Sequence, residues 1–332
     1  MILMIKIKQT PTLILLMLFL TASSSGYSAS INKPNTDISN INWEKIEEKT
    51  VTLFYPGQSS WEWLLTRHSA AKSVRKGAPC LECHEDEEKE MGNIIVRGEK
   101  LEPFPIKDKP GFIKVKIKST YDDYNIYFQV QWKDLGFKSG PTSQFKNKVT
   151  LMIGDNSVKE FPVAGCWGVC HDDATNMNSH KEKNERQLYT SASRVKIKKS
   201  GGGDNFIDDN HLTSLLEEKN ILEYWQLRLT NNGQSSTSHG YILEKRHKIK
   251  NKQFDASVTH KNNIWTAIFS RKRNINSKGI IPLNRNHEYT LGIALHDDYV
   301  SGRNHYVGFG RTFSLGELSG SNGNSEITVQ KQ

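Results

Sequence analysis

Cysteine is scarce in this chain, with four residues among 332. Four are too few for a disulfide scaffold in a protein of this length. They are clustered, because Cys80 lies beside Cys83 and Cys166 beside Cys170, and a histidine directly follows each pair. Paired cysteines with an adjacent histidine are typical of a site for a metal or a metal-containing cofactor.

Long apolar runs are also scarce, since none after residue 30 approaches the roughly 20 residues that span a bilayer. Within residues 1–30, Lys6 and Lys8 precede an apolar run from Leu13 to Leu20 and a stretch rich in Ser and Ala. This layout predicts a secretory signal peptide over residues 1–30 and a periplasmic protein. An uncleaved N-terminal anchor, which would add membrane association, is the alternative.

Acidic residues are outnumbered, and the formal net charge is +9 with a pI of 9.2. The lysines are spread through segments such as "VKIKST" and "KIKNKQ" without an interleaved aromatic platform. Nucleic acid is therefore excluded as the expected partner of an exported protein. A diffuse positive field favours an acidic redox partner protein, or a membrane-bound cytochrome or quinol-oxidising complex. Solubility alone is the other interpretation.

The sequence lacks the βαβ alternation of a parallel sheet. Instead, apolar and polar residues alternate in "FIKVKIKS" and "NIYFQVQW", which predicts a β-hairpin with one dry face. Further strands are expected at residues 148–154, 221–229, 263–271, 288–295 and 305–310. We predict a mainly β protein, with an antiparallel β-sandwich over residues 99–316, a few short helices that carry the cysteine motifs, and a flexible tail over 317–332.

Residues 31–98 read as a polar linker followed by a helical segment. A helix is predicted over residues 59–77, with Ser59 and Glu62 as a capping box and Gly77 as its end. His68 lies on the apolar face of this helix with Trp61 and Leu64. The acidic run that follows, residues 85–90, is expected to be a solvated helical face.

"CLECH", at residues 80–84, has the spacing of a c-type haem attachment site. Cys80 and Cys83 would form thioether bonds to the two vinyl groups, and His84 would be the proximal iron ligand. A thioredoxin-like redox pair would need a βαβ setting, and the knuckles of a zinc ribbon lie only about 15–20 residues apart. A disulfide or another metal site is the remaining alternative.

"CWGVCH", at residues 166–171, has one residue more between its cysteines. Gly168 would let this longer loop bulge, so Cys166 and Cys170 are predicted to hold a second haem, with His171 as its proximal ligand. A Cys166–Cys170 disulfide is the alternative. The chain is therefore expected to carry two c-type haems, the second being the less regular.

The ligand opposite each proximal histidine is commonly His or Met. For the first haem, His68 is favoured over Met91 because it lies on an apolar helical face. For the second, Met177, His296 and His305 compete, and their spacing does not choose between them.

Three segments resemble a known family: "FIKVKIKSTYDDYNIYFQVQWKD", "FPVAGCWGVCHDD" and "YTLGIALHDDYVSGRNHYVGFG". They are similar to the haem-binding domain of the gamma subunits of ethylbenzene dehydrogenase and dimethylsulfide dehydrogenase, and more so to the c-type cytochromes related to them. The resemblance implies a β-sandwich that passes electrons between a partner enzyme and the respiratory chain. It implies His305 as the second distal ligand, because the family's lysine ligand lies at the corresponding position.

We therefore expect a periplasmic dihaem cytochrome that carries single electrons and is not an enzyme. Two alternatives are a haem enzyme with an open position for a small substrate such as nitrite or peroxide, and a haem-bearing subunit of a larger oxidoreductase.

Overall fold

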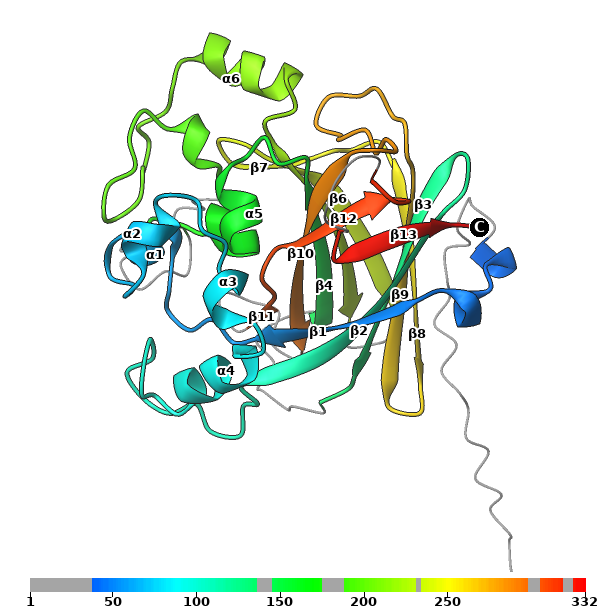
Figure 1. Cartoon of the computed structure of the whole chain (residues 1–332), viewed down its shortest axis with the longest axis horizontal. Coiled ribbons are helices and arrows are strands. Elements are labelled where there is room, and N and C mark those ends of the chain that lie inside the picture. Colours follow the sequence, from blue (N-terminus) through cyan, green and yellow to red (C-terminus); the bar gives the residue numbers. More distant parts are fainter. Residues whose placement is uncertain (1–37, 136–144, 175–187, 231–233, 298–304, 319–324) are drawn as a thin grey trace, which may run out of the picture.

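The computed structural model describes residues 38–135, 145–174, 188–230, 234–297, 305–318 and 325–332 (Figure 1). The predicted signal peptide, residues 1–30, lies outside these ranges. Within them, no helix has the length and apolar character needed to cross a membrane.

The body of the protein is one β-sheet, in which nearly all neighbouring strands are antiparallel. Within the described residues its order is β7-β6-β5-β4-β10-β11-β1-β2-β3-β9-β8, with β12 and β13 branching from β10 and β2. The strands are β1 (Glu48–Phe54), β2 (Phe112–Tyr121), β3 (Asn125–Lys133), β4 (Phe145–Gly154), β5 (Leu222–Thr230), β6 (Ser235–Ile242), β7 (Arg246–Lys248), β8 (Phe254–Lys261), β9 (Ile264–Lys272), β10 (Glu288–Asp297), β11 (Tyr306–Val307), β12 (Arg311–Leu315) and β13 (Ile327–Lys331).

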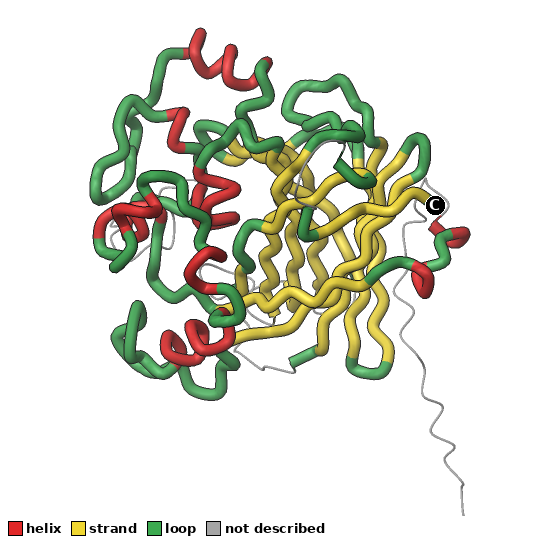
Figure 2. Tube along the Cα trace, in the orientation of Figure 1, coloured by secondary structure: helices red, strands yellow, loops and turns green. Residues whose placement is uncertain are grey.

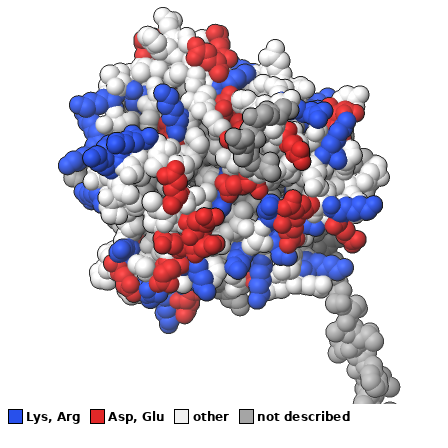
Figure 3. Space-filling model, viewed as in Figure 1, with Lys and Arg blue, Asp and Glu red and all other residues white. Residues whose placement is uncertain are grey.

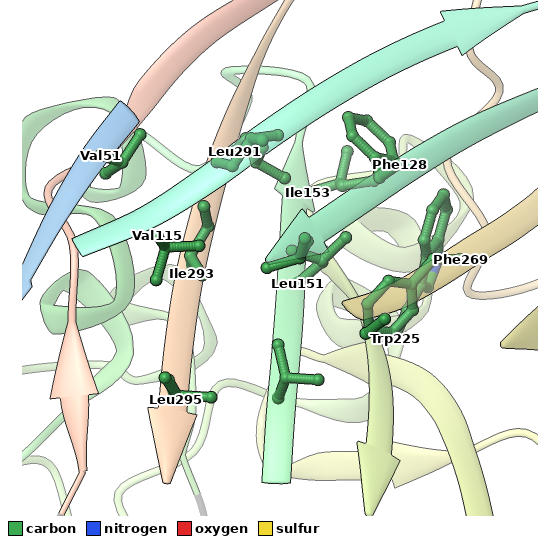
Figure 4. Packing of buried hydrophobic residues seen from close by; sticks show 14 of the residues in the cluster. Val51, Val115, Phe128, Leu151, Ile153, Trp225, Phe269, Leu291, Ile293 and Leu295 are labelled. Atoms are coloured by element: carbon green, nitrogen blue, oxygen red, sulfur yellow. The ribbon is translucent and has the colours of Figure 1, made fainter. Parts of the chain in front are cut away.

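The predicted mainly β fold with a few short helices is confirmed. The sheet curls so that β5 and β6 contact β8, and the faces of the predicted sandwich therefore belong to one continuous sheet (Figure 2). Apolar side chains from β1, β2, β3, β4, β5, β9 and β10 meet in its interior (Figure 4). Fully burying each large side chain contributes about 1.5–3 kcal/mol, so this interior is the main source of stability.

The hairpin predicted from alternation is present as β2 and β3. Val115 pairs with Trp132 and Ile117 with Val130, and all four side chains are buried. The lysines between them on β2 point away from the core, as the period of two requires.

Both ends of the described chain are more ordered than the sequence predicts. β1 begins inside the predicted linker and pairs with β2 and β11. The prediction of a flexible tail is wrong for residues 327–331. There β13 pairs with β2 and β12 and buries Ile327 and Val329. Five residues carry too short an alternating pattern to be recognised, and two neighbouring strands supply their partners.

The helices are short, and α1–α5 gather at one side of the sheet (Figure 1). They are α1 (Trp61–Thr66), α2 (Ala71–Val74), α3 (Leu81–His84), α4 (Glu88–Val96), α5 (Glu160–Ala164) and α6 (Asp209–Glu217), with 3₁₀ helices η1 (Ile38–Asn40), η2 (Trp43–Lys45), η3 (Gly165–Val169) and η4 (Ser191–Ser193).

The single helix predicted over residues 59–77 is wrong, because α1 and α2 are separated at residues 67–70. The ring of His68 interrupts the helix, since its Nδ1 accepts the N–H of Ala70 at 3.2 Å. The predicted capping box is also wrong. Ser60 caps α1 by accepting the N–H of Trp63, while Glu62 is buried and bonds elsewhere.

Candidate haem sites

The first cysteine motif is a tight turn at the surface. The N–H groups of Cys83 and His84 both donate to the carbonyl of Cys80, at 3.2 and 3.1 Å. Cys83 is exposed, whereas Cys80 is half-buried against an apolar cluster. The turn therefore presents one thiol to solvent and one to the protein, and both lie close to His84.

The ring of His84 lies opposite that of His68, with centroids 5.9 Å apart and planes at 71°. A ring nitrogen lies about 2 Å from a metal ion that it ligates, and two such bonds plus the two ring radii give a centroid separation of about 6 Å. Nδ1 of His84 donates to Oε2 of Glu87 at 2.8 Å, which leaves Nε2 for a metal. The centroid separation is therefore compatible with both rings ligating one haem iron.

His68 would change one contact on ligation. A neutral imidazole has one donor and one acceptor nitrogen, and here Nδ1 accepts the amide of Ala70. As a ligand through Nε2, His68 would carry its proton on Nδ1 and give up this bond. Met91, the competitor, packs against the same apolar cluster, but the geometry that fits an iron is the His68–His84 pair.

The second motif is largely buried and begins at a glycine with positive φ. Gly165 ends α5 with φ 56° and ψ −134°, and a Cβ there would lie 2.7 Å from the backbone nitrogen of Gly310. The extra residue between the cysteines forms part of η3, after which the N–H of Cys170 donates to the carbonyl of Trp167 at 2.9 Å. Gly168 does not have a positive φ, so the loop does not use the backbone freedom of glycine there; a Cβ at this position would lie 2.8 Å from the carbonyl oxygen of Glu160, and close packing on α5 excludes a side chain.

The thiols themselves are not paired. All four cysteines are free in this structure, so the Cys166–Cys170 disulfide is absent from it. Burial raises the pKa of the Cys80 and Cys166 thiols to about 12, so both are protonated at neutral pH in the absence of a bound group. Within the described ranges, no group of three or more His, Cys, Asp and Glu side chains could hold a metal ion by itself.

His171 is fully buried and both ring nitrogens face acceptors. Nδ1 donates to Oε1 of Glu62 at 2.5 Å, and Nε2 lies 3.0 Å from the carbonyl oxygen of Tyr189, whose ring stacks on the imidazole at 3.7 Å. The cysteines and Nδ1 fit a haem site. Iron at Nε2 would take the place that the Tyr189 carbonyl oxygen has here.

The two motifs pack together as one unit. The N–H of Cys80 donates to the carbonyl of Val163 at 2.9 Å, and the N–H of Trp61 donates to that of Cys170 at 2.7 Å. Between them, Phe54, Trp167 and Phe309 form an aromatic group with ring centroids 5.2–5.9 Å apart. Groups attached to both motifs would therefore be neighbours.

The predicted second distal ligands lie elsewhere on the sheet. His296 and His305 stack on each other, with centroids 4.6 Å apart and planes at 13°. Cys166 Sγ lies over Gly292, and His296 follows four residues later on the same face of β10, about 13 Å along the strand. His171 instead contacts Glu62 and Tyr189, and Met177 lies outside the described residues.

Three residues near the histidines were not predicted. Glu87 lies three positions after His84, so helical spacing could have found it. Glu62 reaches His171 from 109 positions away, and Tyr189 from 18. Neither contact has a signal in the local sequence.

Comparisons with known proteins indicate a c-type cytochrome. No family model matches the chain. Cytochrome c-552 of Stutzerimonas stutzeri is 30% identical over 296 residues, which cover 87% of this chain and 90% of that protein. Cytochrome c-551 of Rhodocyclus tenuis is 26% identical over 164 residues, 48% of this chain and 67% of that protein.

Among solved structures, a family 9 carbohydrate-binding module from Caldicellulosiruptor kristjanssonii in complex with cellotriose gives a TM-score of 0.28 at 8% identity, over 66% of this chain and 75% of that one. A similarity this low supports no statement about the chain.

Proposed function

The chain belongs to the cytochrome c-552 family, and from that premise we propose that it is a periplasmic dihaem c-type cytochrome that carries single electrons between respiratory partners. Haem iron, when bound, supplies the one-electron couple. The observation that carries the proposal is the His68–His84 pair, whose rings lie 5.9 Å apart directly beside Cys80 and Cys83.

In this proposal the chain's own residues attach two haems, ligate their irons and hold them close to each other. Cys80 and Cys83 would hold one haem and His84 and His68 would both ligate its iron, so no place would be left for a substrate. Cys166, Cys170 and His171 hold the second. Because two backbone hydrogen bonds and the aromatic group join the motifs, electrons would pass between the haems inside one chain.

The partner is proposed to be an acidic redox protein that docks beside the first motif. Four exposed basic residues surround His68 and its helices: Arg67, Lys72, Arg75 and Lys76. Figure 3 shows Lys and Arg gathered over α1 and α2, and Asp and Glu over α3 and α4. Complementary charge of this kind steers encounter, and it would bring a partner close to the exposed Cys83.

The proposal includes a family relationship and a second distal ligand, both of which come from the sequence resemblance. The relation to the gamma subunits of ethylbenzene and dimethylsulfide dehydrogenases rests on the three segments that resemble them. His305 as second distal ligand rests on the same resemblance, and its ring stacks on that of His296.

The deciding experiment is a pyridine haemochrome assay with protein quantitation, on full-length protein produced together with cytochrome c maturation factors. Two covalent haems per chain are expected. A result of one haem per chain would contradict the dihaem proposal. A result of no covalent haem would contradict the proposal that the protein is a c-type cytochrome.

The alternative function, a haem enzyme with an open site, is favoured by one observation: among the described residues, the His171 ring contacts Glu62 and Tyr189, and neither His296 nor His305 is among its partners. Ferrous protein exposed to carbon monoxide separates the two functions. Immediate, strong binding would favour the enzyme, and no binding would favour the electron carrier.

A further inference from the structure

Each proximal histidine donates its Nδ1 proton to a carboxylate, but in opposite surroundings. His84 and Glu87 lie 2.8 Å apart at the surface, with side chains 24% and 58% exposed. His171 and Glu62 lie 2.5 Å apart in the interior, with side chains 0% and 1% exposed. A histidine–carboxylate pair is therefore present twice, once partly exposed at the surface and once fully buried.

We propose that Glu62 is the positioning residue of His171 and that its buried charge holds the second haem at a lower reduction potential than it would otherwise have. The inference rests on the proposed function, because it requires a haem at Cys166 and Cys170. Glu62 lies on α1, close in the sequence to the residues of the first site. The inference gives it a role in the second site instead.

Geometry fixes which nitrogen of His171 is left for iron. An Nδ1–H that donates to a carboxylate sets the tautomer and the orientation of a metal-bound histidine. Here the second oxygen of Glu62, Oε2, accepts the N–H of Asp172 at 2.9 Å, so both oxygens are directed at the residues after Cys170. Rotation of the imidazole would break the Nδ1–H bond to Oε1, so Nε2 is the nitrogen that would meet iron, in place of its present contact with the carbonyl oxygen of Tyr189 at 3.0 Å.

The place of Glu62 is held from both sides. The N–H of the preceding Trp61 donates to the carbonyl of Cys170, and Ser60 caps the helix that carries Glu62. Among the described residues, Glu62 forms its ion pair with His171 and none with a Lys or Arg, and the Arg194 guanidinium lies farther away, over the opposite face of the Tyr189 ring. The negative charge therefore acts on the histidine and on whatever the histidine binds.

The sign of the effect follows from charge. Ferric haem carries one more positive charge than ferrous haem, so a nearby carboxylate stabilises the ferric form and lowers the potential. Coulomb energies are about four times larger at the effective dielectric constant of a protein interior than in water. Glu62 should therefore act strongly, whereas the solvated Glu87 should act weakly on the first haem.

The test compares Glu62→Gln with Glu87→Gln in the holoprotein. Midpoint potentials are measured by spectroelectrochemical titration, and the haems are assigned with a Cys166→Ala/Cys170→Ala variant. Glu62→Gln should raise the reduction equilibrium constant of the second haem at least tenfold, which is 59 mV for one electron, and leave the first unchanged. Glu87→Gln should change that of the first haem less than threefold.

A second measurement needs no variant and covers the case in which Glu62→Gln does not fold. In NMR spectra of the ferric wild-type holoprotein, one proximal Nδ1–H resonance should persist after transfer to D₂O, and the other should vanish at once. Immediate loss of both resonances would overturn the inference.

The outcomes separate this inference from the proposed function. Two haems per chain with an unshifted second potential in Glu62→Gln would overturn the role of Glu62 and leave the dihaem cytochrome standing. A single haem at the first motif in the wild type would overturn both.

Discussion

The two cysteine motifs differ in where their surroundings come from. The first is built from one stretch of chain: His68, Cys80, Cys83, His84 and Glu87 lie within 20 residues, and Cys83 is exposed. The second is assembled from distant segments. Glu62 lies before it, and Tyr189 and Gly310 follow it, and all reach it through tertiary packing.

This difference explains why the regular motif is at the surface and the irregular one is buried. The first motif closes on its own hydrogen bonds on α3, and its tertiary support is the bond from the N–H of Cys80 to Val163 and the stacking of His84 on Phe309. The longer loop of the second motif passes between Glu160 and the backbone of Gly308 and Gly310, where only glycine fits. The additional residue between Cys166 and Cys170 therefore belongs to the segment that packs closely on its neighbours.

The largest effect should come from removing the thiols of one motif. Cys80→Ala/Cys83→Ala and Cys166→Ala/Cys170→Ala should each lower the haem content from two to one per chain, because each pair attaches its own group. The haemochrome assay measures this. If either double variant lost both haems, the motifs would depend on each other, and the contrast between a local and an assembled site would fail.

Replacing His68 should alter the first haem without removing it. In His68→Ala, one axial position opens, so the ferric spectrum should change from low spin to high spin and ferrous protein should bind carbon monoxide. His305→Ala is the matching variant for the second haem and should do the same there. An unchanged spectrum in His68→Ala would indicate that Met91 is the distal ligand of the first haem. An unchanged spectrum in His305→Ala would indicate His296 or Met177 for the second haem.

Glycine substitutions should separate the two motifs by stability. Gly77, beside the first motif, has φ 90°, and a Cβ added there would meet no atom of the described residues within 4 Å. Gly77→Ala should therefore cost only the left-handed conformation, roughly 1–2 kcal/mol. Gly165→Ala adds contact with the Gly310 backbone and should cost about 3 kcal/mol or more. Denaturant unfolding of both holoproteins measures the difference, and equal values would contradict it.

The smallest effect should come from surface charge near the first motif. Lys72→Glu/Arg75→Glu should slow oxidation by anionic ferricyanide several-fold, roughly 3–10, at low ionic strength, and should not slow oxidation by cationic cobalt tris-phenanthroline. Stopped-flow rates as a function of salt test this, since screening should remove the difference. Lys261→Glu, on β8 away from the helices, is the control.

Local patterns were enough for the first site and for much of the sheet. The sequence predicted the β2–β3 hairpin and five further strands, of which the last is only Tyr306–Val307, and it paired "CLECH" with His68, whose ring the structure brings next to His84 although the helix expected there is interrupted. The pattern failed where a strand is polar or short. β6, "SSTSHGYI", has little apolar alternation and becomes a strand because it pairs with β5 along its length.

What the sequence by itself determined is the chemistry: two cysteine pairs with adjacent histidines, and the strands whose apolar faces form the core. Residue types and short periods encode these directly. Only the tertiary structure decided which carboxylate meets which histidine. Glu62 looked like part of a helix cap, yet the fold buries it against His171, because a contact across 109 residues depends on how the whole sheet brings α1 and η3 together.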